Sequence, residues 1–255
     1  LFQTIGNILD LIEKDDMPKY LLFLENAFPY MDNYNYHKGM KRIIQELKVL
    51  LKTKSIGTNS DRALLLDFQA TLETKPEKAI KLEKDALAQI ENITADNARL
   101  VSNLHANLGG LYRMNGHPDL AREHMEKSIS LLDQFNLLHI NDSIPQIANY
   151  AMFLTEQQEP ERGISELQKL SGIIKEYHSD DCLDYAKVQE TLGTIYLMTA
   201  NLPQAKTHFK RAFKIYEKIW ADEPEMIEAK YQEIQELYPQ IGFSIGKTLS
   251  GLLTK

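Results

Sequence analysis

Cysteine is nearly absent from this sequence, and several other features that mark common protein classes are scarce. The 255 residues include one cysteine, Cys182, which excludes an internal disulfide and any metal site built from several cysteines. One cysteine also fits a reducing compartment, so we predict a cytoplasmic location. Only 12 glycines and 9 prolines are available for tight turns, which argues against a fold of many short strands.

Excess positive charge and long apolar runs are missing as well. Lysine and arginine number 29 against 36 aspartates and glutamates, which gives a formal net charge of -7. Nucleic-acid-binding domains usually carry a basic stripe, so we predict no direct nucleic-acid partner. No apolar run approaches the roughly 18 residues that cross a bilayer, and we expect no membrane partner. The hydrophobic content of 43% is enough to bury a sizeable core.

Two segments of the sequence repeat the same pattern. One contains Gly109, Tyr112 and Ala121, and the other contains Gly193 and Tyr196 at the same spacing. The two glycines lie 84 residues apart, which indicates two periods of 42. Such self-similarity at a fixed period is the signature of a repeat architecture.

Weaker units continue the 42-residue period on both sides and in the middle. Ala151 lies halfway between the two strong units, and Asp67 lies one period before the first. A further step back of about 40 residues reaches Ala27, and one step forward from Gly193 reaches Gln235. Degenerate outer units are typical of those that cap a stack.

The residue types indicate pairs of antiparallel helices. Gly109 and Ala121 would let two helix axes approach closely, where larger side chains would push them apart. Apolar residues recur at helical spacing through both strong units. Pro118, Pro160 and Pro203 stand where each second helix should begin, and proline suits a first helical turn.

This pattern resembles the tetratricopeptide repeat (TPR), in the long form found in kinesin light chain and in sensor arrays of bacterial signalling ATPases. The resemblance implies an all-α fold, a right-handed α-α superhelix of about six antiparallel helix pairs. We expect one domain over 1–255, with degenerate helices in 1–59, core repeats in 60–221, and a last repeat with a capping helix in 222–255.

In such repeats the first helix of each pair lines a concave groove. The resemblance therefore implies a protein-interaction module that binds a peptide or partner protein in this groove, and we expect no enzymatic activity. Asn107 and Asn149 occupy one repeat position, and the resemblance implies that they hydrogen-bond an extended peptide backbone; alternatively, they are tolerated polar residues on a solvated face. The predicted binding residues are Asn103, Asn107, Gly110, Arg113, Asn149, Met152, Lys187, Thr191 and Thr194.

No catalytic residue, cofactor or metal is predicted. His105, His117 and His124 are interpreted as surface or packing residues, and the charged run 73–84 as a solvated helix face. The terminal segments 2–12 and 241–253 could mediate a homodimer. An alternative function is a peptide-sensing regulatory domain of a larger bacterial signalling or transcription-regulating protein, because the chain begins at Leu1 rather than at a methionine.

Overall fold

The computed structural model describes residues 20–21, 23–24, 27–28, 31–32, 36–53, 57–140 and 143–237. The regular structure of these residues is entirely helical, and the chain divides into two compact units, Leu1–Phe135 and Asn136–Lys255. The helices are α3 (His37–Thr53), α4 (Asn59–Thr71), α5 (Pro76–Leu87), α6 (Ala98–Met114), α7 (Pro118–Gln134), α8 (Ser143–Glu156), α9 (Pro160–Tyr177), α10 (Leu183–Met198), α11 (Leu202–Ile219) and α12 (Pro224–Leu237).

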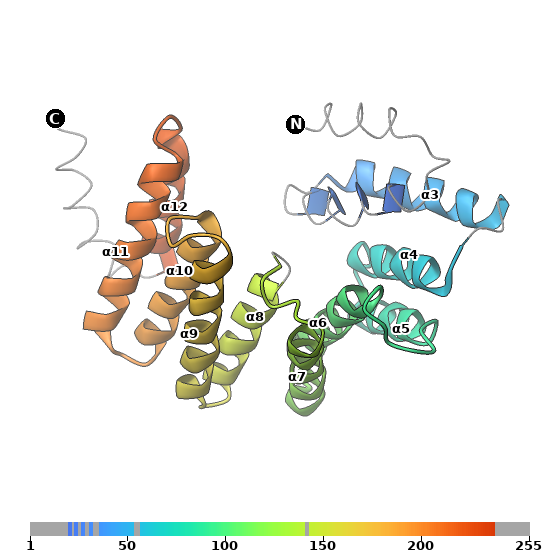
Figure 1. Cartoon of the computed structure of the whole chain (residues 1–255), viewed down its shortest axis with the longest axis horizontal. Helices are drawn as coiled ribbons and strands as arrows, with labels where there is room; N and C mark the ends of the chain where they lie inside the picture. The colour runs from blue at the N-terminus through green and yellow to red at the C-terminus, as the bar shows by residue number, and fades with distance from the viewer. Residues whose placement is uncertain are drawn as a thin grey trace. The chain divides into compact units, whose positions relative to one another are not determined.

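In the first unit α3 packs against α4 of the hairpin α4–α5, and α5 packs against α6 of the hairpin α6–α7 (Figure 1). Its core joins Met40 and Leu47 of α3 to Phe68 of α4 and Leu104 of α6, all at most 4% exposed. The ring of Phe28 stacks on Phe68 with centroids 3.9 Å apart. Burial of such large apolar side chains is the main force that holds the helices together.

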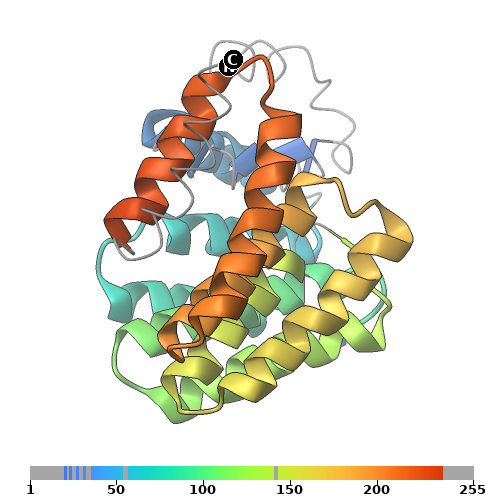
Figure 2. The ribbon, with the colours of Figure 1, turned by 90° about the vertical axis from the view of Figure 1, so that its left-hand side faces the viewer.

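The second unit contains the hairpins α8–α9 and α10–α11, followed by α12. Figure 2 faces this unit and shows α11 and α12 as neighbouring orange and red helices joined by a short turn. Phe153, Phe209 and Tyr216 are its largest fully buried side chains. Phe213 of α11 also meets Tyr231 of α12 edge to face, which seats the last helix on the hairpin before it.

The 42-residue period is visible in the helix boundaries. The second helices of the four hairpins begin at residues 76, 118, 160 and 202. Gly116, Gln158 and Ala200 have positive φ in three of the hairpin turns, at 75°, 66° and 59°. In each of these turns the following N–H donates to a carbonyl five residues earlier, over 2.7 to 2.9 Å, which caps the first helix.

The helices of the three later hairpins cross at small residues, as the sequence predicts. A Cβ added to Gly109 would lie 2.6 Å from Met125 Cγ and 3.3 Å from the Ala121 carbonyl oxygen. A Cβ on Gly163 would lie 2.6 Å from the backbone oxygen of Ala151, closer than real Cβ atoms come to backbone. Glycine is therefore required where the α9 backbone meets α8.

The prediction of an all-α fold of antiparallel helix pairs is confirmed, as are the second-helix starts at Pro118, Pro160 and, within the first turn, Pro203. The segments 2–12 and 241–253, predicted to cap or dimerise, lie outside the described residues. The single-domain arrangement and the hand of the superhelix stay predictions. Within the described part of the chain, no helix combines the length and apolar character needed to span a bilayer.

Candidate functional site

The first helix of the α6–α7 hairpin carries four of the predicted binding residues. Asn107 is exposed, whereas Asn103, Gly110 and Arg113 are half-buried. No atom outside the neighbouring backbone lies within 4 Å of a Cβ built on Gly110. The face of α6 beside Gly110 is therefore open.

The amide of Asn107 is engaged within the first unit. Its Nδ2 donates to Asp67 Oδ1 of α4 at 2.8 Å and to Glu83 Oε1 of α5 at 3.2 Å. One side chain thus joins three helices through two carboxylates. The amide nitrogen of Asn107 therefore stabilises the packing of these helices, although the side chain remains exposed.

The prediction that the charged run 73–84 is a solvated helix face is wrong at Glu83. Its side chain is 2% exposed, since the helical spacing of α5 turns it inward with Ala79 and Ala86. Burial, and then the charge of Asp67 and a hydrogen bond with it, raise the pKa of Glu83 far above its ordinary value. Burial and the neighbouring carboxyl group thus both favour the protonated form of Glu83.

In the second unit the predicted residues lie on α8 and α10, the first helices of its two hairpins. Asn149 is exposed, and its side chain has no hydrogen bond to any other described residue; Met152 is half-buried. On α10, the hydroxyl of Thr191 donates to the Lys187 carbonyl and that of Thr194 to the Glu190 carbonyl. The side-chain N–H donors and carbonyl acceptor of Asn149 are therefore available to a ligand.

A half-buried network of charged and polar side chains joins the last three helices of the second unit. The Tyr216 hydroxyl donates to Glu190 Oε2 at 2.6 Å, and Lys230 Nζ lies 2.9 Å from Glu190 Oε1. Burial, followed by the nearby Glu190 carboxylate, raises the pKa of Tyr216. Burial alone would lower the pKa of Lys230, but Glu190 and Glu233 outweigh it and raise it. Glu190 is therefore satisfied by a hydroxyl and an ammonium and fastens α10, α11 and α12 together.

Two tyrosine–histidine clusters recur 84 residues apart. In the first unit His124 stacks on Tyr112, and its Nδ1 lies 2.9 Å from His105 Nδ1. In the second unit His208 stacks on Tyr196 and bonds Gln189 Oε1 over the same 2.9 Å. Burial, and then the neighbouring His124 and Lys127 charges, lower the pKa of His105 to about 4. The interpretation of these histidines as surface or packing residues fits all three, because His105 and His124 pack together and His117 is exposed.

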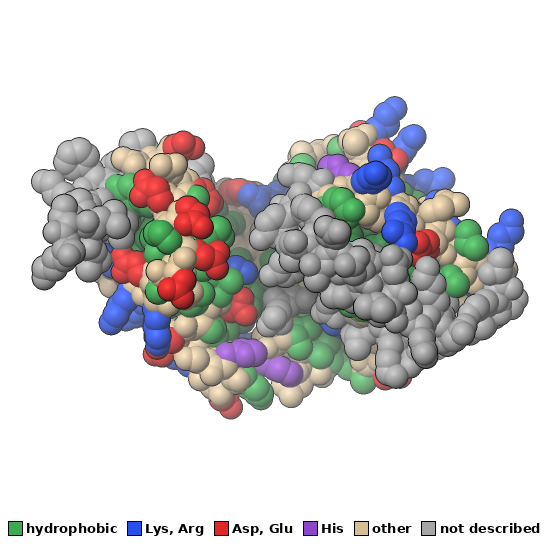
Figure 3. Space-filling model, turned by 90° about the horizontal axis from the view of Figure 1, so that it is seen from above, with side chains coloured by type: hydrophobic (Ala, Val, Ile, Leu, Met, Phe, Trp, Pro, Cys, Tyr) green, Lys and Arg blue, Asp and Glu red, His purple; other side chains and the backbone are tan. Residues whose placement is uncertain are grey.

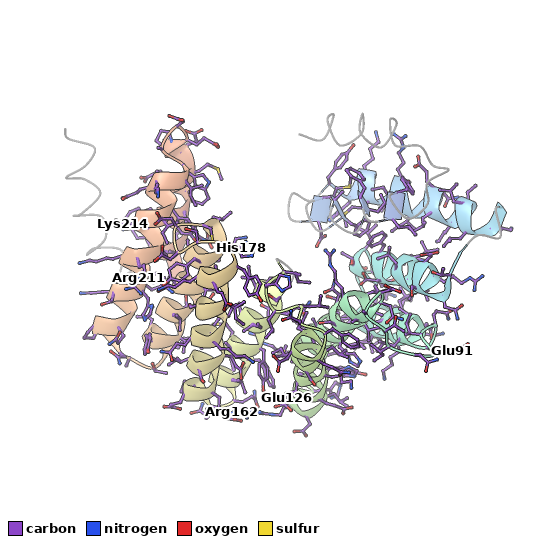
Figure 4. The ribbon with its side chains drawn as sticks, in the orientation of Figure 1. Glu91, Glu126, Arg162, His178, Arg211 and Lys214 are labelled. Carbon is purple, nitrogen blue, oxygen red and sulfur yellow. The ribbon has the colours of Figure 1, made fainter. Side chains whose placement is uncertain are left out.

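The described residues form no group of three or more metal-ligating side chains. His178, labelled in Figure 4 at the turn after α9, bonds the His139 carbonyl oxygen over 3.0 Å. Acidic side chains gather on the second unit, at the left of Figure 3, where α12 exposes Glu225, Glu228, Glu233 and Glu236. These charges make a solvated acidic surface.

Comparison with known proteins agrees with this geometry. Residues 143–218 match the family model of the tetratricopeptide repeat. This segment, residues 143–218, carries tetratricopeptide repeats. A search of curated proteins finds no match.

Solved structures with a similar fold include the following two proteins. BtubC (BKLC) from P. vanneervenii is 17% identical, with a TM-score of 0.62 over 85% of this chain and 90% of that one. A variant of a putative kinesin light chain with TPR-like repeats from Podosopora anserina is 13% identical, with a TM-score of 0.59 over 78% of this chain and 96% of that one. These likenesses establish the fold, and stacked tetratricopeptide hairpins form scaffolds for protein–protein interaction.

Sequence reasoning missed the role of Asp67 and Glu83. Asp67 takes the place that Gly109 takes one period later, and Glu83 takes the place of Met125. A signal was present, because the aligned units carry small and apolar residues at these two positions. Alignment of the second helices would have shown that Glu83 lies on the packed face of α5.

Proposed function

We propose that the chain binds an extended segment of a partner protein along the exposed faces of its first helices. In the second unit this face is formed by α8 and α10 and includes Asn149, Met152, Lys187, Thr191 and Thr194. In the first unit it is formed by α4 and α6 and includes Asn103, Asn107, Gly110 and Arg113.

The exposure of Asn149 is the observation that carries this proposal. An amide side chain donates and accepts in one plane, so it can pair with both groups of a peptide unit. Asn149 offers these groups without competition from a described neighbour, next to the half-buried Met152. Thr191 presents a weaker position, because its hydroxyl donates to its own helix at Lys187. We therefore place the main backbone contact of the second unit at Asn149.

A selection of displayed random peptides on the full chain tests the proposal. A selected peptide is synthesised with a fluorescent label, and its affinity is measured for the wild type and for Asn149→Ala. Loss of two hydrogen bonds should weaken binding by about tenfold. Gln168→Ala is the matched control, because Gln168 is an exposed amide on α9, the second helix of the same hairpin. Equal affinities of the wild type and Asn149→Ala would contradict the assignment of this face.

A further inference from the structure

Helix α11 carries a stripe of positive charge, although the net charge of the chain is -7. The stripe consists of Lys210, Arg211, Lys214 and Lys218, which are all exposed. Their spacing places them on one face of the helix, within about 100° of its circumference. Figure 4 labels two of these residues, Arg211 and Lys214, on α11. Glu217, the acidic residue of the same helix, is half-buried instead.

The chain itself supplies little negative charge to this basic stripe. Lys218 forms an ion pair with the exposed Asp181. A hydrogen bond from Lys218 and its charge, and then the charge of Lys214, lower the pKa of Asp181. Lys210, Arg211 and Lys214 form no ion pair with any described residue. Because like charges four residues apart on a helix repel, the stripe is unfavourable for α11 by itself.

The basic stripe is not a general feature of the repeat. The second helices of the two preceding hairpins carry mixed or neutral residues at the same four positions. In α9 these are Gln168, Lys169, Gly172 and Glu176, and in α7 they are Glu126, Lys127, Ser130 and Gln134. Packing of the hairpins therefore does not require cations at these positions, which points to a role in binding.

The neighbouring helix α12 exposes the opposite charge. Glu225, Glu228 and Glu236 lie within about 80° of its circumference and form an acidic stripe. Figure 3 shows the acidic side chains gathered over this part of the second unit. By the helical rise, the basic stripe is about 12 Å long and the acidic stripe about 17 Å long. No ion pair joins α11 to α12 among the described residues, so the two stripes do not neutralise each other within one chain.

We infer that two copies of this chain associate through these stripes, with α11 of each copy packed against α12 of the other. In a two-fold arrangement each contact occurs twice, so both basic stripes are neutralised at once. A second copy fits better than a nucleic acid or an anionic membrane, because a polyanion on α11 would be repelled by the acids of the neighbouring α12. The contact uses neither α8 nor α10, so the inference is independent of the proposed peptide face.

Sedimentation equilibrium of charge-reversed chains of all 255 residues tests the inference. One variant carries Lys210→Glu, Arg211→Glu and Lys214→Glu, and a second carries Glu225→Lys, Glu228→Lys and Glu236→Lys. The wild type should dimerise at about 50 mM salt, where charges are weakly screened. Each variant alone should dimerise at least about tenfold more weakly, because like charges then face each other. An equimolar mixture of the two variants should form a heterodimer with an affinity within about threefold of that of the wild type.

A matched control separates the two stripes from net charge. Lys75→Glu with Lys78→Glu and Lys81→Glu reverses three exposed lysines at α5 and should leave dimerisation unchanged. Circular dichroism checks that each variant is folded, and recovery of the heterodimer shows the same independently.

Three results would overturn the inference: a monomeric wild type, a dimer that neither reversal weakens, or reversed chains that do not associate with each other. The wild type is also tested with a labelled oligonucleotide and with phosphatidylserine vesicles. Binding to either by a monomeric wild type, with loss in the α11 variant, would assign the basic stripe to a polyanion instead. The proposed peptide binding would stand in each of these cases, because it is measured on Asn149.

Discussion

Replacement of His105 by glutamine should make the first unit less sensitive to acid. In the folded chain the pKa of His105 is lowered to about 4 from 6.5, because burial and nearby positive charge disfavour the imidazolium. The stability that depends on neutral His105 is present above pH 6.5 and is lost as the pH falls toward 4. Glutamine cannot be protonated in this range, so the variant should not suffer that loss.

The size of the effect follows from the pKa difference. Between about pH 7.5 and about pH 5, a fully buried histidine with this shift would lose about 2 kcal/mol of unfolding free energy. His105 is only half-buried, and solvent screening reduces the loss to about 1 kcal/mol. The second unit already has glutamine at the equivalent position. Gln189 bonds His208 over 2.9 Å, the same distance that separates His105 from His124.

Other charged groups near His105 and His124 also affect the pKa values of these two histidines. The charge of Lys127 lowers the pKa of His105. The pKa of His124 is lowered mainly by burial; the charge of Glu123 raises it, and the charge of Lys84 lowers it. The His124 imidazole remains in the variant, so part of the acid sensitivity should persist. The variant isolates His105 because the other charged groups are unchanged.

Urea unfolding followed by far-UV circular dichroism at the two pH values measures the difference. His117→Gln is the control, because it removes an exposed histidine at the start of α7 and leaves the pair in place. Hydrogen exchange of peptides from α6 and α7 locates the change in the first unit. The reasoning would be refuted if His105→Gln lost as much stability between the two pH values as the wild type.

Three further predictions concern backbone and core positions. Ala200→Gly should raise the unfolding free energy by about 0.5 kcal/mol, because Ala200 has φ 59° and glycine adopts this conformation without strain. In α9, Gly163→Ala should destabilise by about 1–3 kcal/mol through its contact with the α8 backbone, whereas Gly172→Ala, with open space around its Cβ, should stabilise by about 0.5–1 kcal/mol. Asp67→Ala with Glu83→Met should stabilise the first unit by about 1–4 kcal/mol at neutral pH. This double variant should also remove the loss of stability that the raised pKa of Glu83 causes as the pH rises above its unfolded value. Thermal and urea unfolding of each variant beside the wild type check all three.

Much of the fold could be predicted from the sequence because a repeat protein is held together by near neighbours. Gly109 and Ala121 meet across one hairpin, and Pro118 and Pro160 mark helix starts, so the signals lie within one period of each other. The turn conformation was harder to predict. Gln158 and Ala200 have positive φ without the glycine that marks the same turn at Gly116, because the hairpin geometry imposes the conformation.

The candidate site was predicted only in part, and the reason is its long-range contacts. The position of Asn107 on an exposed helix face followed from the repeat register. Its bonds to Asp67 and Glu83 span 40 and 24 residues and depend on how two other helices pack. Charge alternation in the run 73–84 concealed Glu83, because a single inward position does not change the average character of a helix face.

Glu190, which is half-buried, and Glu83, which is buried, are held in different ways. Glu190 has a tyrosine hydroxyl at 2.6 Å and the Lys230 ammonium at 2.9 Å, so its charge is met within the fold. Glu83 is more deeply buried, yet the donor that reaches it is the neutral amide of Asn107. Stability alone would favour the apolar pair of the neighbouring hairpins at this position.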